Sequence, residues 1–209
     1  CSVCAVTEGD ALGHRFDSYV CSVCGSASPD ILAVYTADEL VTALEKGGDI
    51  VLMADIPAGN YIESDAFFVT KDTVLDLNGH SISSEYGYIF LVTNNATLTI
   101  CGDGVLDLDN NGNYGTSVSI VSGSTLMLFG GTLEGTLEVG GHCVMTGGKV
   151  MEMTDFYAES VTISGGELTS LLGFTDRNLA ITGGTFGFDP SQFVPNGPYK
   201  IVCNSNEAY

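Results

Sequence analysis

The stretch "TISGGELTSL" at residues 162–171 decides the fold, because shortened versions of it recur along the chain. Close variants of the order apolar residue, polar residue, two glycines, polar residue and apolar residue occur three more times, with Phe129 in the polar position of one copy. These copies are "LFGGTLEG" (128–135), "MTGGKVME" (145–152) and "ITGGTFGF" (181–188). A repeat of about 20 residues indicates a solenoid or a related array. We interpret each copy as one coil of a stacked β-solenoid.

The copies share a register when they are aligned on one glycine of each turn: Gly79, Gly102, Gly130, Gly147, Gly165 and Gly183. The residues four and two positions before each glycine, and three positions after it, are all apolar, and most residues between them are polar or small. This alternation predicts half-buried strands on both sides of the turn. The positions four before the glycine are expected to form one buried file: Leu75, Leu98, Leu126, Cys143, Val161 and Leu179. Met127 and Val144 are apolar at positions where the pattern predicts outward side chains.

The alternative fold is a β-sandwich made of hairpins. Hairpins favour Asn-Gly or Asp-Gly turns and need no register between distant copies. Only "LDLNGHSIS" (75–83) fits that pattern, so the six registered copies favour the solenoid. The two longer steps in the repeat predict loops near 84–90 and 109–117.

A helix is expected just before the first coil, in "TADELVTALEKGG" (36–48). Thr36 and Glu39 form a capping-box pattern, and Gly47 and Gly48 end the helix. Ile50, Leu52 and Ile56 then form a first, less regular coil. Because the end of a solenoid exposes unpaired backbone groups, an amphipathic helix lying over it is the expected cap.

Composition and charge limit the classes of function. The chain has 209 residues with 44% apolar content and 27 glycines, which suits one sizeable core with many tight turns. Six basic and 26 acidic residues give a net charge of -20, which disfavours nucleic acids, anionic lipids and polyanionic polysaccharides as partners. The longest apolar run, "YIFLV" (88–92), is too short to span a membrane. Because the chain begins with Cys1 rather than Met, we expect a processed product or an excised fragment.

Residues 36–203 resemble the pectate-lyase-like right-handed parallel β-helix modules of large secreted and surface proteins, which are common in Gram-positive gut bacteria. The resemblance lies in "ADELVTALEKGGDIVLMADI", "VLDLNGHSIS", the repeated "TISGGELT" and the closing "ITGGTFGFDPSQFVPNG". It implies an all-β, single-stranded right-handed parallel β-helix with an N-terminal capping α-helix. It also implies secretion or a location on the cell surface, but no particular reaction. The expected organisation is a small Cys-rich element at 1–30 followed by the capped β-helix at 31–209.

The N-terminal cysteines form the sharpest local motif. Cys1 and Cys4, then Cys21 and Cys24, make two Cys-x2-Cys pairs at the spacing of a zinc ribbon. Four thiolates would hold a structural Zn²⁺ with no open position for catalysis. The sequence "CSVCG" (21–25) also resembles short knuckles of the same surface proteins, and His14 is a candidate substitute ligand. Two disulfides are the alternative, and lipidation of Cys1 would remove one ligand.

The remaining cysteines are interpreted as structural residues. Cys143 occupies an inward position of the repeat and is expected to act as a small core hydrophobe. Cys101 aligns with Phe129 beside a turn. The pattern gives no position for Cys203.

No strong catalytic pattern is present. Asp76, Asp107 and Asp109 are candidates for the paired carboxylates of a glycoside hydrolase, but each alternates with aliphatic residues and is expected to point outward. His80 and His142 occupy turns, where solvated histidines are common, and the few basic residues are scattered. Ca²⁺ is a second candidate ligand, because "DGVLDLDNNGN" (103–113) is rich in oxygen donors but lacks the EF-hand spacing.

The aromatic residues around the first long loop give a binding hypothesis. Tyr86, Tyr88 and Phe90 alternate, and Tyr114 lies in the next long loop, so they are candidates for a platform that stacks sugar rings. The preferred alternative is that they fill the core or cover a loop.

These observations favour a non-enzymatic extracellular module that serves as a spacer, a fibre or filament subunit, or an adhesive display surface. Its expected partners are other copies of itself or other surface proteins. A carbohydrate-binding or polysaccharide-cleaving domain is the alternative function.

Overall fold

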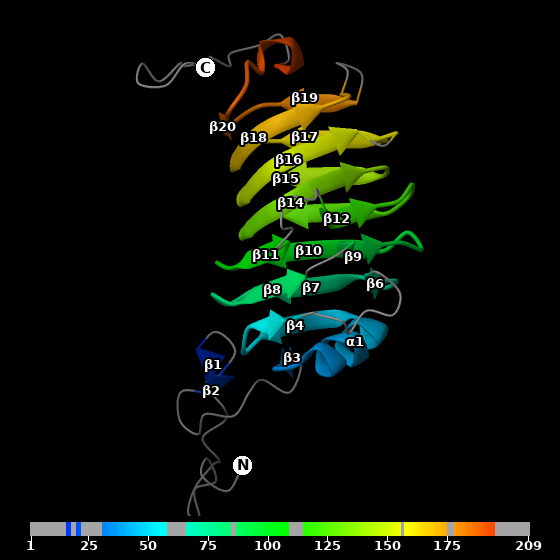
Figure 1. Cartoon of the computed structure of the whole chain (residues 1–209), viewed down its shortest axis with the longest axis vertical. Helices are drawn as coiled ribbons and strands as arrows, with labels where there is room; N and C mark the ends of the chain where they lie inside the picture. Colours follow the sequence, from blue (N-terminus) through cyan, green and yellow to red (C-terminus); the bar gives the residue numbers. More distant parts are fainter. Residues whose placement is uncertain are drawn as a thin grey trace, which may run out of the picture.

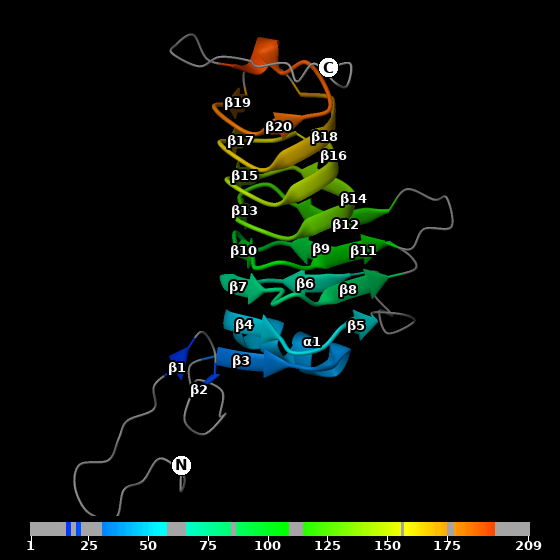
Figure 2. The same cartoon turned by 90° about the vertical axis from the view of Figure 1, so that its left-hand side faces the viewer.

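The chain folds into stacked coils of short parallel strands, as the computed structural model in Figures 1 and 2 shows. The structure describes residues 31–57, 66–84, 87–108, 115–155, 157–174 and 178–194, together with the backbone of 16–17 and 20–21. Within these ranges the protein is predominantly β, with one α-helix, and is a parallel β-solenoid. Near the N-terminus, β1 (Phe16–Asp17) and β2 (Val20–Cys21) pair in the antiparallel sense.

One sheet of eight strands runs along the whole stack. From the C-terminal end it comprises β19 (Leu179–Ile181), β17 (Ser160–Ile163), β15 (His142–Met145), β13 (Thr125–Leu128), β10 (Thr97–Cys101), β7 (Thr73–Asp76), β4 (Gly48–Leu52) and β3 (Ile31–Val34). Its strands are parallel and pair without a register shift. Strand β3 lies before the helix, where the sequence pattern did not predict a strand.

A second sheet of ten strands forms the rest of each coil. Its main path is β20 (Thr185–Phe186), β18 (Glu167–Leu172), β16 (Lys149–Asp155), β14 (Thr132–Val139), β11 (Val105–Leu108), β8 (Ser81–Ser84) and β5 (Ile56–Pro57). The early coils add β6 (Phe67–Val69), β9 (Tyr88–Val92) and β12 (Thr116–Ile120), which pair beside one another. Part of the predicted loop at 84–90 is therefore the strand β9, and β12 begins within the range predicted as the second loop.

The predicted file of inward side chains is confirmed over the last five coils. In register, Leu98 lies opposite Leu126, which is followed by Cys143, Val161 and Leu179. All five are at most 4% exposed. Burial raises the pKa of the Cys143 thiol to about 12, so this cysteine stays neutral and acts as a core hydrophobe, as predicted.

The first copy of the repeat is aligned differently from the prediction. Thr73, not Leu75, lies opposite Leu98, and Leu75 lies opposite Ile100. After the turn, Leu106 rather than Val105 pairs with Leu133 and faces the core. The turns of the first two coils thus differ in length from the Gly-Gly turns of the later coils, which shifts the inward positions.

The two positions of each later Gly-Gly turn require glycine for different physical reasons. A Cβ on Gly165 would lie 2.2 Å from the carbonyl oxygen of Thr146 in the coil below, so the backbones of successive coils leave no room for a side chain. Gly166 has a φ of 85°, a left-handed conformation that glycine adopts most easily. The repeated Gly-Gly pair therefore allows both close stacking and a sharp bend.

The helix α1 (Ala37–Lys46) lies at the N-terminal end of the stack (Figure 1). The hydroxyl of Thr36 accepts a hydrogen bond from the N–H of Glu39, and the Glu39 carboxylate accepts one from the N–H of Tyr35. Gly47 ends the helix with a φ of 72°. The buried face of α1, which includes Leu40 and Leu44, contacts β3 and β6. The predicted helix and its limits are confirmed.

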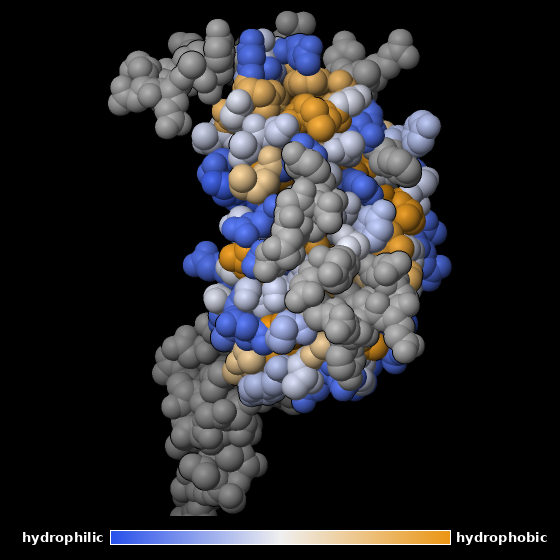
Figure 3. All heavy atoms as spheres, viewed as in Figure 1, coloured by the Kyte–Doolittle hydropathy of each residue, from blue (hydrophilic) through white to orange (hydrophobic). Residues whose placement is uncertain are grey.

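The C-terminal end of the stack is partly covered by apolar residues. The short 3-10 helix η2 (Ser191–Phe193) contacts β19, and Phe193 is 6% exposed. Phe186 and Phe188 pack edge to face, with ring centroids 5.5 Å apart. Figure 3 shows apolar residues gathered near this end.

Candidate functional site

The predicted zinc ligands lie outside the residues whose side chains the structure describes. Cys1, Cys4 and Cys24 are not described, and Cys21 is described only as part of the backbone of β2. His14, Cys203 and the last five residues of the predicted calcium segment (109–113) also lie outside the described residues. Within the described ranges, no three His, Cys, Asp or Glu side chains converge as a metal site would require. The zinc and calcium hypotheses remain predictions.

The two candidate catalytic carboxylates that the structure describes lie on different sheets. Asp76 lies on β7 of the eight-stranded sheet, whereas Asp107 lies on β11 of the other sheet, where it pairs with Ser83. The Asp76 carboxylate accepts a hydrogen bond from the N–H of Asn78, which stabilises the turn. Asp109 lies outside the described residues. Asp76 and Asp107 therefore do not form the facing pair that glycoside hydrolysis needs.

The proposed aromatic platform is not formed by the residues that are described. Phe90 is fully buried and packs against Phe67, with ring centroids 5.8 Å apart. Tyr88 is 36% exposed. Tyr86 and Tyr114 lie outside the described residues. Phe90 thus belongs to the core, as the preferred alternative predicted.

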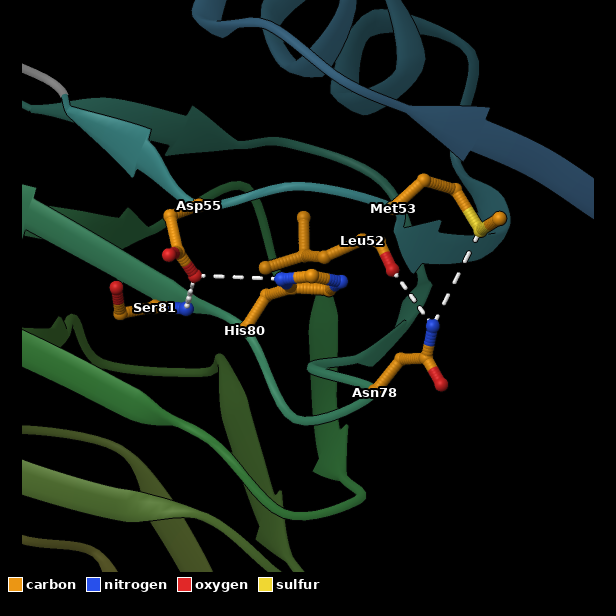
Figure 4. Close-up of polar contacts among 6 residues, drawn as sticks. All are labelled: Leu52, Met53, Asp55, Asn78, His80 and Ser81. Carbon is orange, nitrogen blue, oxygen red and sulfur yellow. Dashed lines mark hydrogen bonds and ion pairs between the residues drawn. The ribbon is translucent and has the colours of Figure 1, made fainter.

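His80 forms a pair with a carboxylate from the preceding coil, as Figure 4 shows. Its Nδ1 lies 3.2 Å from Oδ1 of Asp55, which also accepts a hydrogen bond of 2.9 Å from the N–H of Ser81. The bond from Ser81 and the pairing with His80 lower the pKa of Asp55. In the same turn, Asn78 donates to the carbonyl oxygen of Leu52 at 2.9 Å. These polar contacts join two successive coils.

His142 belongs to a larger network that joins three coils. Its Nδ1 lies 2.8 Å from the hydroxyl of Ser160, and its Nε2 lies 2.9 Å from Oε2 of Glu159. The other carboxylate oxygen, Oε1, accepts hydrogen bonds from the Ser122 hydroxyl and from the N–H of Gly123. These two bonds and the charge of His142 lower the pKa of Glu159. The sequence pattern predicted a solvated turn residue at His142 and gave no sign of Ser160 or Glu159 as its partners.

The network contains the residue types of a Ser-His-Glu triad, but the two backbone N–H groups of Glu159 and Ser160 beside it are already hydrogen bonded. Acyl transfer by such a triad needs free backbone N–H groups to stabilise an oxyanion. The N–H groups of Glu159 and Ser160 both donate to the carbonyl oxygen of Gly141. A cavity of about 330 Å³ lies elsewhere, between β3 and α1, and includes none of these residues. The network therefore links successive coils through hydrogen bonds and an ion pair.

The network of His142 and Glu159 predicts that the stability of the protein depends on pH. A carboxylate whose pKa is lowered by folding stabilises the folded state at higher pH, and this contribution is lost as the pH falls through its folded-state pKa. For Glu159 the loss begins below its ordinary value of 4.5. Glu159→Gln is expected to lower the melting temperature at neutral pH, and the difference from the parent protein should be smaller at a pH below 4.5. Thermal unfolding followed by circular dichroism at both pH values measures this.

Glu134→Gln is the matched control, because Glu134 is an exposed glutamate on β14. It should leave the melting temperature nearly unchanged at either pH. An equal effect of the two variants would show that the Glu159 network does not stabilise the stack.

The geometry defines the chain as a parallel β-solenoid. No protein-family model matches the chain, and no curated protein or solved structure shows significant similarity to it. The one helix in the described ranges is too short to cross a bilayer.

Proposed function

We propose that this chain is a non-enzymatic extracellular module, in which a rigid right-handed β-helix serves as a structural or adhesive surface. One observation carries the proposal: the polar side chains with catalytic potential bond from one coil to the next, as the His142 network does. The net charge of -20 suits a solvated surface location. The resemblance of the repeats to β-helix modules of surface proteins supports the same role.

We propose further that the stack is right-handed and that both of its ends are capped. The right-handed sense follows from the strong preference of connections between parallel strands for that hand. The buried face of α1 suits a cap over the first coil, since exposed strand edges favour aggregation. At the other end, Phe193 and η2 suit the same purpose.

The function is tested by incubating the full chain with a panel of neutral and acidic glycans. No reducing ends and no unsaturated uronates should be released during long incubation. Steady release of either product, with loss of that release in Glu159→Gln or Asp55→Asn, would overturn the proposal and support an enzyme.

A carbohydrate-binding role is the second candidate, and exposed aromatic residues on neighbouring strands favour it. Phe68 on β6 is 45% exposed and Tyr88 on β9 is 36% exposed. A glycan array should then give signals that fall in the Phe68→Ala and Tyr88→Ala variants. An array without signals would remove this candidate and leave the structural role.

The Cys-rich element is proposed to hold one structural zinc ion. Protein purified without chelators is expected to contain one Zn²⁺ per chain, because four thiolates complete a tetrahedral site. Cys4→Ser should abolish stoichiometric binding, whereas Cys143→Ser should leave it unchanged because Cys143 lies in the β-helix core. Mass spectrometry should find the four N-terminal thiols without added reductant, and two intact disulfides would contradict the prediction.

A further inference from the structure

The outer face of the eight-stranded sheet carries no Asp, Glu, Lys or Arg over five successive strands, and its one histidine, His142, pairs with Glu159, which lies directly before β17. We call the outward side chains of β10, β13, β15, β17 and β19 the uncharged face. These strands contain no Asp, Glu, Lys or Arg, although the chain contains 26 acidic residues. By contrast, β14, β16 and β18 of the neighbouring sheet carry Glu134, Glu138, Glu152 and Glu167. Charge is therefore unevenly distributed around the solenoid.

The centre of the uncharged face is apolar. One outward file runs in register through Thr99, Met127, Val144, Thr162 and Ala180. Met127 and Val144 are the two residues that departed from the polar alternation in the sequence, and the structure places them side by side.

More apolar surface borders this file. Val74 on β7 lies next to Thr99 and is 37% exposed. Phe129, directly after β13, is 50% exposed. A contiguous exposed apolar area on a soluble protein commonly marks an interaction site.

The uncharged face is also regular. Its five strands pair without any register shift, whereas β14 pairs irregularly with both β12 and β16 in the other sheet. Figure 2 shows these strands stacked along one side of the molecule. Such a surface suits another sheet, because two sheets pack face to face about 10 Å apart.

We propose that the uncharged face binds the same face of a second copy of this chain, which forms a two-fold symmetric dimer. Two copies that each carry a net charge of -20 repel one another. A contact through this face keeps the acidic residues of the other sheet in solvent, and the Glu159 carboxylate beside the face is already paired with His142. The inference rests on the proposed structural role, since it specifies how copies of the module associate.

The face is small for a protein–protein interface. Five strands spaced about 4.8 Å apart, of three to five residues each, give roughly 300 Å² per copy. A standard stable interface buries about 800 Å² per partner. The dimer is therefore weak, and it forms at high protein concentration or where neighbouring modules are held together.

Sedimentation velocity of the full chain from about 10 μM to about 1 mM tests the inference, since this range covers weak association. The average mass should rise from that of one chain toward twofold. Higher salt should strengthen the association, because it screens the repulsion between two acidic chains. A parent protein that stays monomeric throughout this range, at low and high salt, would overturn the inference.

The chain offers a matched pair of variants. Met127→Glu places a carboxylate on the uncharged face, and Met151→Glu makes the same change on β16 at a methionine that is 38% exposed. Met127→Glu should abolish association, whereas Met151→Glu should retain it. The opposite result would overturn the inference.

A second pair of variants tests the same inference in case Met127→Glu does not fold. Thr162→Lys lies on the uncharged face and Thr169→Lys lies on β18, and both threonines are exposed. Thr162→Lys should weaken the dimer at least tenfold, and Thr169→Lys should not. Circular dichroism verifies that each variant is folded. A folded monomer without glycan-cleaving activity contradicts only the dimer, whereas a dimer that cleaves glycans contradicts only the proposed function.

Discussion

Gly165→Ala is expected to destabilise the protein by about 3 kcal/mol, the upper part of the range for overpacked positions. The new Cβ would lie 2.2 Å from the carbonyl oxygen of Thr146, a backbone atom that cannot move unless the coil below also moves. The same close approach occurs at Gly147, where a Cβ would meet the carbonyl oxygen of Phe129. Denaturant unfolding followed by circular dichroism measures the loss.

Gly79→Ala is the matched control for backbone crowding. Gly79 has a φ of 81°, but a Cβ there would have no atom within 4 Å. This variant should lose only about 1 kcal/mol, the cost of a left-handed conformation for alanine. If both variants lost the same free energy of unfolding, the close stacking of the Gly-Gly turns would not be what requires glycine.

Leu126→Ala is expected to cost about 3–4 kcal/mol, because it removes a large side chain from the middle of the buried file. Leu126 is fully buried and lies between Leu98 and Cys143 in register. Such a loss is a large part of the total stability of a typical domain. The melting temperature and the free energy of unfolding should both fall markedly.

The next residue provides the comparison. Met127 is apolar like Leu126 but points outward from the same strand. At a low protein concentration, where the chain is monomeric, Met127→Ala should change the stability by no more than about 0.5 kcal/mol. A larger loss for Met127→Ala than for Leu126→Ala would contradict the assignment of inner and outer faces.

The later coils could be predicted from the sequence because their turns have the same form. From Gly130 onward each copy uses a Gly-Gly turn, and the inward residues Leu126, Val161 and Leu179 follow from the alternation. The capping residues of α1 could also be predicted, because their hydrogen bonds join residues only three or four positions apart in the sequence.

The inward residues of the early coils were harder to predict, because the glycine used to align the first copy, Gly79, is not part of a Gly-Gly turn. Gly79 follows Asn78, whose φ is 48°, and the two form a left-handed turn instead of a Gly-Gly pair. The next turn contains Gly102, Asp103 and Gly104, and Leu106 therefore replaces Val105 at the inward position. A repeat with turns of different lengths has no single sequence period.

The contacts of the two histidines could not be predicted from local sequence. Asp55 lies 25 residues before His80, and Glu159 lies 17 residues after His142. These pairs meet only because successive coils stack in a particular register at their turns. An acidic chain has many carboxylates, so the sequence alone gave no reason to select these two.

The central claim is that successive coils stack in parallel with like residues above like. Interstrand nuclear Overhauser effects between backbone protons in solution test it most directly. Parallel stacking predicts interstrand contacts that connect Leu98 to Leu126, Leu126 to Cys143, and Cys143 to Val161. Antiparallel contacts between strands adjacent in sequence, such as 125–128 with 132–139, would contradict it.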